Sequence, residues 1–376
     1  MAVAYQFVCM AVGDQLRIYH LNYDEYNRKV SIPENKKITS LQFIPSFDDC
    51  MCVLWVGTDK GDIFEIDVLT GAISSKRVVH SDSLNHIVQN QKDVWSLDSN
   101  GRLKIWKVNA SGVITLSDEP RPLRLRERPD VICMCAQTLW KASDSLIEVY
   151  DVCESSQQLL LKKIQCQSTV TCFARIARHK WVLSGHDDGK LTVWSEIDNS
   201  KVDILNISNS RITALLLLGS FVWVGFVTGK VSIFEFSETS WRLWKEFSIF
   251  YSESISGFYL DEFSLLRDKL CQVACVSEKG QVRILDGCLT RDHLAFDMQS
   301  NEESFCSYRD MKILVASWNV NAARPNDLES SRDGDMLTEW LHFGQDTDIL
   351  VFGFQELIDL ESVRFLLFCF RNVLML

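Results

Sequence analysis

A tryptophan frame recurs through the first three hundred residues and constrains the fold more than any other feature. In its clearest form an apolar residue flanks the tryptophan and a glycine follows six positions later, as in Trp55 to Gly61, Trp95 to Gly101 and Trp223 to Gly229. Further copies are degenerate: one around Trp140, one at 182–189 beside Trp181, and weak ones at 11–16 and 274–280. Such self-similarity predicts an array of like units.

A short alternating segment follows the turn glycine in five of these units. The segments are 62–67, 102–106, 190–194, 230–234 and 281–285. Alternation with a period of two predicts a β-strand with one apolar face. The Asp-Lys-Gly, Ser-Asn-Gly, Asp-Asp-Gly and Thr-Gly turns supply the positive φ that a tight turn requires, so each unit contains a hairpin.

The turn glycines measure the repeat length. Gly61 to Gly101 spans 40 residues, Gly101 to Gly189 spans 88 for two units, Gly189 to Gly229 spans 40 and Gly229 to Gly280 spans 51. A unit of about 40–45 residues with four strands is typical of a WD-repeat β-propeller. Seven hairpins predict seven blades, and the fold class is therefore mainly β.

The units also resemble the WD-repeat family at their ends. Trp106, Trp194 and Val149-Tyr150-Asp151 lie where that family has its terminal Trp-Asp dipeptide. Only one of these offers the aspartate, so we expect the hydrogen-bond network of strong WD repeats to be mostly missing. An apolar strand precedes every hairpin except the first, and an open ring would expose an edge. We therefore predict that residues 293–296 pair near residues 6–19 and close the first blade.

Composition narrows the class of protein and its compartment. Hydrophobic residues make up 47% of the 376 residues, and the net charge is 39 − 50 = −11, which disfavours a protein that coats nucleic acid. The 13 cysteines form no CxxC pair and no apolar run reaches 18 residues. We expect reduced thiols and a cytoplasmic protein, with peripheral membrane association as a further option.

One cationic stretch departs from this acidic balance. Residues 120–129 contain Arg121, Arg124, Arg126 and Arg128 between prolines. This stretch is either an anion or membrane patch or a solvated loop between blades, stiffened by its prolines. His186, in the turn of one hairpin, is interpreted as structural rather than catalytic.

Beyond residue 310 the pattern changes to strand, helix, strand. Apolar segments at 312–318 and 348–354 predict buried strands, and 333–343 has the spacing of an amphipathic helix. A crossover helix makes the two strands parallel, which brings Asn319 and Glu356 to the same edge. A carboxylate and an amide oxygen supply part of a Mg²⁺ site, although capping of the strand ends is an alternative reading of these residues.

The same segment resembles a family of enzymes. Trp318-Asn319-Val320-Asn321-Ala322, followed by Asp348 to Leu357, is similar to the opening of the inositol polyphosphate 5-phosphatases of the DNase-I-like endonuclease/exonuclease/phosphatase superfamily. Several plant and fungal members carry an amino-terminal WD-repeat region. The resemblance implies Mg²⁺-dependent hydrolysis of the 5-phosphate of phosphoinositides or soluble inositol phosphates. Glu356 would hold the metal, and Asn319 would orient the metal or the phosphate.

The resemblance covers only residues 311–360. The family's downstream Gly-Asp-Leu-Asn, Pro-Ala-Trp-Thr-Asp-Arg and Ser-Asp-His segments have no counterpart here, so we expect this chain alone to be inactive and its end to be premature. We predict a propeller at 1–297, a linker at 298–310, a phosphatase-domain fragment at 311–360 and an atypical apolar tail at 361–376. The alternatives are a non-catalytic WD-repeat scaffold that binds protein partners and, third, a nuclease.

Overall fold

A computed structural model describes the chain apart from residues 45–52, 91, 110–113, 126–128, 136, 154–159, 238–239, 262–264, 266–268, 270, 320, 322–334, 336–338, 340–341, 343–345 and 357–376. The chain divides into two compact units, Met1–Thr290 and Arg291–Leu376. Each unit is considered by itself below.

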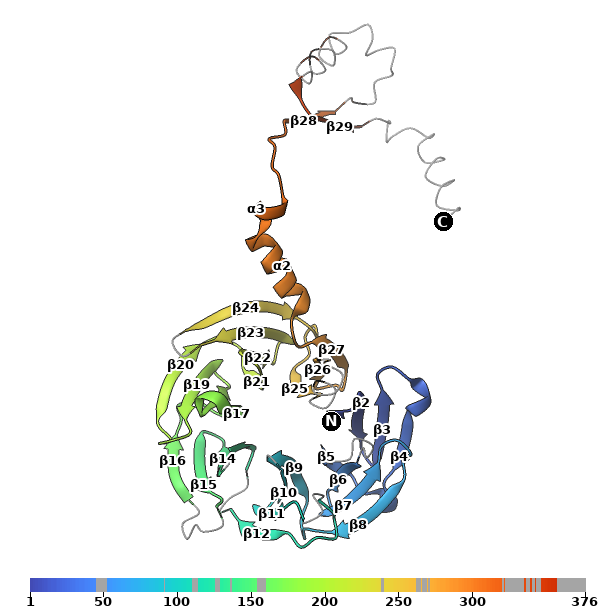
Figure 1. The fold of residues 1–376 in the computed structure, drawn as a ribbon, viewed down its shortest axis with the longest axis vertical. Helices are drawn as coiled ribbons and strands as arrows, with labels where there is room; N and C mark the ends of the chain where they lie inside the picture. The colour runs from blue at the N-terminus through green and yellow to red at the C-terminus, as the bar shows by residue number, and fades with distance from the viewer. Residues whose placement is uncertain are drawn as a thin grey trace. The chain divides into compact units, whose positions relative to one another are not determined.

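The first unit is a ring of seven antiparallel sheets, and the predicted seven-bladed propeller is confirmed (Figure 1). Blades 1 to 3 contain β1 (Ala2–Ala4), β2 (Phe7–Val12), β3 (Gln15–His20), β4 (Arg28–Ser31); β5 (Ile38–Phe43), β6 (Val53–Thr58), β7 (Asp62–Asp67), β8 (Ile73–Val78); and β9 (Leu84–Asn90), β10 (Asp93–Asp98), β11 (Arg102–Trp106), β12 (Arg121–Arg124).

Blades 4 to 7 continue in the same order around the ring. They contain β13 (Val131–Cys135), β14 (Thr138–Ser143), β15 (Leu146–Asp151), β16 (Leu160–Gln165); β17 (Val170–Ile176), β18 (Trp181–His186), β19 (Lys190–Ser195), β20 (Lys201–Asn206); β21 (Ile212–Leu218), β22 (Phe221–Phe226), β23 (Lys230–Phe236), β24 (Trp241–Ser248); and β25 (Ile255–Leu260), β26 (Gln272–Ser277), β27 (Val282–Asp286). Short 3₁₀ helices are η1 (Asp24–Tyr26), η2 (Pro33–Asn35) and η3 (Ala177–His179).

In its complete form the repeated frame contains two glycines, one two residues after the tryptophan and one six residues after it, and the structure requires glycine at each position. The turn glycines Gly61, Gly189 and Gly229 have φ between 77° and 79°, and a Cβ on each would collide with a backbone carbonyl after the fourth strand of its blade. The glycine two residues after the tryptophan admits the next blade: a Cβ on Gly225 would lie 2.9 Å from Ile255 Cγ2. The tryptophans themselves are buried between blades, so the repeat encodes the packing of neighbouring sheets.

The ring closes differently from the prediction. Residues 293–296 belong to the helix α2 (Thr290–Ser300), so the strand predicted there is wrong. The inner strand of blade 1 is β1, which pairs antiparallel with β2. Asp261, fully buried after β25, accepts the backbone N–H groups of Tyr5 and Gln6 at 3.0 and 2.6 Å and so joins blade 7 to blade 1. A four-residue segment with only two large apolar side chains does not distinguish a strand from an exposed helix.

The hydrogen-bond network of WD repeats is mostly missing among the described residues, as expected, because the indole N–H groups of Trp106, Trp140 and Trp223 have no hydrogen-bond partner. Parts of it remain in blades 3 and 5. In blade 3 the ring of His80 lies 2.7 Å from Ser96 Oγ and 3.3 Å from Asp98 Oδ2. In blade 5 the indole N–H of Trp194 donates to Ser184 Oγ at 2.8 Å, and Ser184 contacts His186 at 2.9 Å.

Blade 4 replaces this network with a buried ion pair. Lys141 Nζ donates to Glu148 Oε2 at 3.0 Å, and the hydroxyl of Tyr150 donates to the same oxygen at 2.7 Å. Burial raises the pKa of Glu148, but the hydrogen bonds from Lys163, Tyr150 and Lys141 outweigh it and hold that pKa at about 2.

The second unit contains α2, α3 (Glu302–Phe305) and a two-stranded sheet of β28 (Ile313–Asn319) and β29 (Ile349–Gln355). The sheet is parallel, as predicted. The predicted boundary at 297 falls inside α2. Residues 333–343, predicted as the crossover helix, lie largely outside the described residues, as does the tail 361–376. Within the described part of the chain, no helix is long and apolar enough to cross a membrane.

Candidate functional site

The ends of β28 and β29 bring the two predicted metal-site residues to one edge. The parallel register pairs Ser317 with Gly353 and Asn319 with Gln355, which places Glu356 one residue beyond that pair. Glu356 is exposed and has φ +53°, a left-handed conformation that costs a non-glycine residue about 1–2 kcal/mol. The Asn319 Oδ1 accepts the backbone N–H of Asn321 at 2.9 Å. This bond gives Asn319 the capping role that was the alternative interpretation.

The Glu356 carboxylate and the Asn319 amide oxygen are suitable ligands for a hard divalent cation, but two ligands are too few to hold one. A carboxylate and an amide oxygen are ligands that Mg²⁺ accepts, together with waters and substrate phosphate. Among the described residues, no group of three or more His, Cys, Asp or Glu side chains could hold a metal. A complete centre would therefore need ligands from outside the described residues.

The cationic stretch is only partly described. Arg121 and Arg124 lie on β12, where their separation of three residues places them on opposite faces of the strand. Arg121 Nη2 donates to the carbonyl of Val152 at 2.6 Å and so ties blade 3 to blade 4. Arg124 is exposed, and Arg126 and Arg128 lie outside the described residues. The anion patch stays a prediction.

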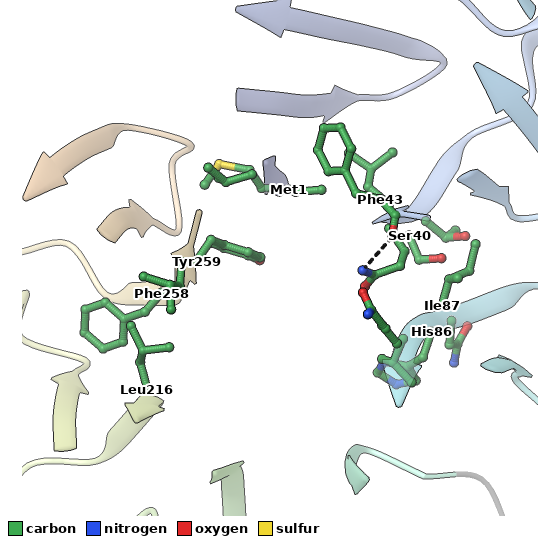
Figure 2. A pocket seen from close by; sticks show the side chains of 17 residues that line it. Met1, Ser40, Phe43, His86, Ile87, Leu216, Phe258 and Tyr259 are labelled. Atoms are coloured by element: carbon green, nitrogen blue, oxygen red, sulfur yellow. Dashed lines mark hydrogen bonds between the residues drawn. The ribbon is translucent and has the colours of Figure 1, made fainter. Parts of the chain in front are cut away.

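A cavity of about 760 Å³ occupies the centre of the propeller (Figure 2). Inner strands of blades 1, 2, 3, 6 and 7 line it, and the labelled side chains include Ser40, His86, Phe258 and Tyr259. No lysine, arginine, aspartate or glutamate is among the described residues that line it. Burial lowers the pKa of His86, which favours its neutral form. The α-amino group of Met1 also lines the cavity, and burial lowers its pKa.

Sequence reasoning missed this cavity and the ring closure. The inner strands were predicted, but which residue of each strand faces the axis depends on the register of the whole ring. Asp261 carried one usable signal, a carboxylate directly after an apolar strand, where free backbone N–H groups of a neighbour are common partners. The interpretation of His186 as structural agrees with its contacts to Ser184 and to the carbonyl of Ser168.

Comparison with known proteins found no matching family model. The chain is 28% identical, over 349 residues, to a Schizosaccharomyces pombe protein described as a probable inositol polyphosphate 5-phosphatase. The match covers 87% of this chain and 29% of that relative, so the chain spans less than a third of the relative's length.

Solved structures share the propeller fold. A chain of a mitotic checkpoint complex matches with a TM-score of 0.58 at 12% identity, over 74% of this chain and 83% of that one. The computationally designed Ika8 protein matches with a TM-score of 0.55 at 16% identity, over 76% and 94% of the two chains. At such identities the likeness is one of fold alone.

Proposed function

We propose that this chain is the propeller and the first two catalytic-domain strands of an inositol polyphosphate 5-phosphatase. The observation that carries the proposal is the parallel register of β28 and β29, which brings Asn319 and Glu356 to one edge in a chain whose curated relative is described as such a phosphatase. The substrates would be phosphoinositides or soluble inositol phosphates, and the propeller would bind protein partners or position the enzyme at a membrane.

In this proposal Glu356 binds Mg²⁺ through its carboxylate, and Asn319 orients the metal or the substrate phosphate. The cation would neutralise charge that develops on the phosphoryl oxygens during hydrolysis of the monoester. The strained backbone at Glu356 supports this role, because such conformations concentrate at binding and catalytic sites. The remaining ligands and the general base would come from outside the described residues.

A chimera tests the proposal. Residues 311–360 of this chain replace the aligned segment of the S. pombe relative, and Mg²⁺-dependent release of phosphate from phosphatidylinositol 4,5-bisphosphate is measured. We expect activity within about tenfold of the parent and a loss of at least a hundredfold on Glu356→Gln. Glu339→Gln, also within the transplanted segment, is the control and should leave activity unchanged.

The unmodified 376-residue chain provides a second measurement. We expect it to release no phosphate above the buffer rate from the same substrate. Turnover by the unmodified chain would refute the statement that further ligands are required. A chimera in which Glu356→Gln and Glu339→Gln behave alike would refute the role of Glu356.

A further inference from the structure

Blade 7 ends at an unpaired strand edge. The other six blades each have four strands, whereas the sheet of blade 7 is β25-β26-β27 within the described residues. We had predicted that blade 1 would be one strand short, and the structure places the shortage in blade 7 instead. An unpaired edge exposes a row of backbone N–H and C=O groups that another strand can bind.

Exposure of the third strand marks the position where the fourth strand is missing. Ile284 pairs with Ala274 and is 38% exposed. The residues at its position in the four-stranded blades 3 to 6 are between 0% and 3% exposed: Ile105, Val149, Val193 and Ile233. An additional strand would bury Ile284 to the same degree.

The turn before β27 also indicates that a fourth strand is missing from blade 7. Gly61, Gly101, Gly189 and Gly229 each accept at their carbonyl an N–H from the chain after the fourth strand of their blade. No such bond reaches Gly280 from a described residue. A Cβ on Gly280 would meet only Met10 Cε at 3.9 Å. The space that a fourth strand occupies elsewhere is open here.

The backbone of β27 is oriented for strand addition. Ser277 donates to the carbonyl of Gln281, and Gly287 donates to the carbonyl of Cys271. In this antiparallel ladder the bonded residues alternate. The N–H and C=O groups of Arg283 and Leu285 therefore point toward β26, and those of Val282 and Ile284 point to the open edge.

Side chains on the edge specify what kind of strand would bind. Arg283 is exposed and forms no ion pair with another described residue. A groove of about 360 Å³ beside β27 is lined by Ile284 and Leu285 together with Lys269 and Asp286, whose charges are opposite. In blade 6 the residue at the position of Arg283 is Ser232, which lies opposite Glu246 of β24 and donates its hydroxyl to that carboxylate at 3.0 Å. An acidic residue at that position of an added strand would pair with Arg283.

We propose that β27 binds an extended segment of a partner protein, with alternating apolar residues and an acidic residue opposite Arg283, as the antiparallel fourth strand of blade 7. In the register of β24 on β23, the residue after the acid would be apolar and would lie opposite Val282, and an apolar residue on the other side of the acid would lie opposite Leu285. This inference rests only on the protein-binding part of the proposed function. Its failure would leave the Glu356 proposal untouched.

A fluorescently labelled peptide with the sequence of β24, Trp-Arg-Leu-Trp-Lys-Glu-Phe-Ser, is the probe, and its anisotropy is measured with the full chain. The register of β24 on β23 would place its glutamate opposite Arg283 and its phenylalanine opposite Val282. We expect saturable binding, and a Glu→Lys peptide should bind about twofold to fivefold more weakly. Arg283→Glu should reverse this preference for the two peptides, which loss of folding would not do.

Ile284→Pro tests the backbone contribution. Proline removes one N–H from the open edge while the hydrogen bonds between β26 and β27 remain, because proline is tolerated on edge strands. We expect Ile284→Pro to lose peptide binding and Ile284→Thr to keep it. The two variants should have equal melting temperatures. Peptide binding that is unaffected by Ile284→Pro or by Arg283→Glu would refute the proposal. An absence of peptide binding would also refute the proposal. The proposal would likewise be refuted if the chain dimerised and Ile284→Pro abolished the dimer, since a second copy of the chain would then occupy the edge.

Discussion

At the scale of single residues, the glycines of the repeat divide into two kinds that the sequence alone does not separate. Those in turns need a positive φ, and those after the tryptophan make room for the next blade. Gly229 and Gly280 occupy the same place in adjacent blades with almost the same φ, 79° and 81°. Only Gly229 faces the carbonyl of Phe250. The pair therefore separates the cost of backbone strain from the cost of a steric clash.

We expect Gly280→Ala to lower the free energy of unfolding by about 1 kcal/mol, the cost of a left-handed alanine. Gly229→Ala should cost about 3 kcal/mol, because its Cβ also collides with backbone that cannot move without opening blade 6. Urea unfolding monitored by tryptophan fluorescence measures both. Equal losses would show that the clash with Phe250 is relieved at little cost.

His80 should make the stability of the propeller depend on pH. Burial lowers its pKa to about 4, and the nearby carboxylate of Asp98 offsets only part of that effect. The unfolded chain binds a proton near pH 6.5 while the folded chain does not. The contribution of His80 to the free energy of unfolding is therefore fully present above pH 6.5. It is lost as the pH drops toward 4, by as much as about 1.4 kcal/mol per pH unit.

Melting temperatures between pH 7.5 and 4.5 check this dependence, with His80→Gln as the variant. The variant should be less stable at pH 7.5 and should show a shallower fall in melting temperature with acidity. Burial also lowers the pKa of His186, so a residual slope is expected. Identical slopes for the two proteins would assign the pH dependence to other groups.

At the scale of elements, one carboxylate joins the two ends of the ring. Asp261 accepts two N–H groups of the β1–β2 turn, whose residues Tyr5 and Gln6 have positive φ and cannot be satisfied within a regular hairpin ladder. A buried N–H without an acceptor costs about 1–3 kcal/mol. The position after β25 is therefore as important to the ring as any core residue.

Asp261→Ala should lower the free energy of unfolding by about 3 kcal/mol. Asp261→Asn keeps one acceptor oxygen, so its free energy of unfolding should lie between those of the unmodified chain and Asp261→Ala. Hydrogen exchange should accelerate first at β1 and β25, while blade 4, on the far side of the ring (Figure 1), stays protected. Asp203→Asn, on the exposed outer strand β20, is the matched control. Uniform acceleration in all blades would contradict a role confined to closure.

Strands differed in how well the sequence predicted them. The hairpins and inner strands combine apolar alternation with glycine turns, and both signals were correct for β5, β9, β17, β21 and the strands that follow them. The outer strands were not located, since sequences such as Lys201–Asn206 lie half in solvent and need no apolar period. β1 consists of three small residues, Ala2–Ala4, which carry little strand propensity.

At the scale of the whole molecule, the candidate site shows where prediction from sequence ends. The parallel order of β28 and β29 followed from the predicted strand–helix–strand connection, so the closeness of Asn319 and Glu356 could be predicted. Capping by Asn319 was the alternative interpretation from sequence, but its partner was not predicted, because the bond depends on the positive φ of Asn321. No pattern within residues 311–360 specifies a substrate or a full set of metal ligands.

Both faces of this sheet carry exposed apolar side chains. Val315 and Val351 lie opposite one another and are 69% and 46% exposed. Parallel sheets are normally covered on both faces, so the chain should bind a hydrophobic dye such as ANS and associate at high concentration. Val315→Lys combined with Val351→Glu should reduce both effects. Val202→Lys, a change at an exposed valine of β20 in the propeller, should not.

The bond that closes the ring also has a consequence for the time course of synthesis. The turn that Asp261 holds is made 255 residues before Asp261 itself. At roughly 5–20 residues per second a ribosome needs about 13 to 50 s to cover that interval. Through this interval blade 1 lacks its contacts with β25 and Asp261 while blades 2 to 6 form behind it. Nascent chains stalled before residue 261 should therefore bind chaperones that recognise exposed apolar segments, and chains stalled some 40 residues later should be released from them.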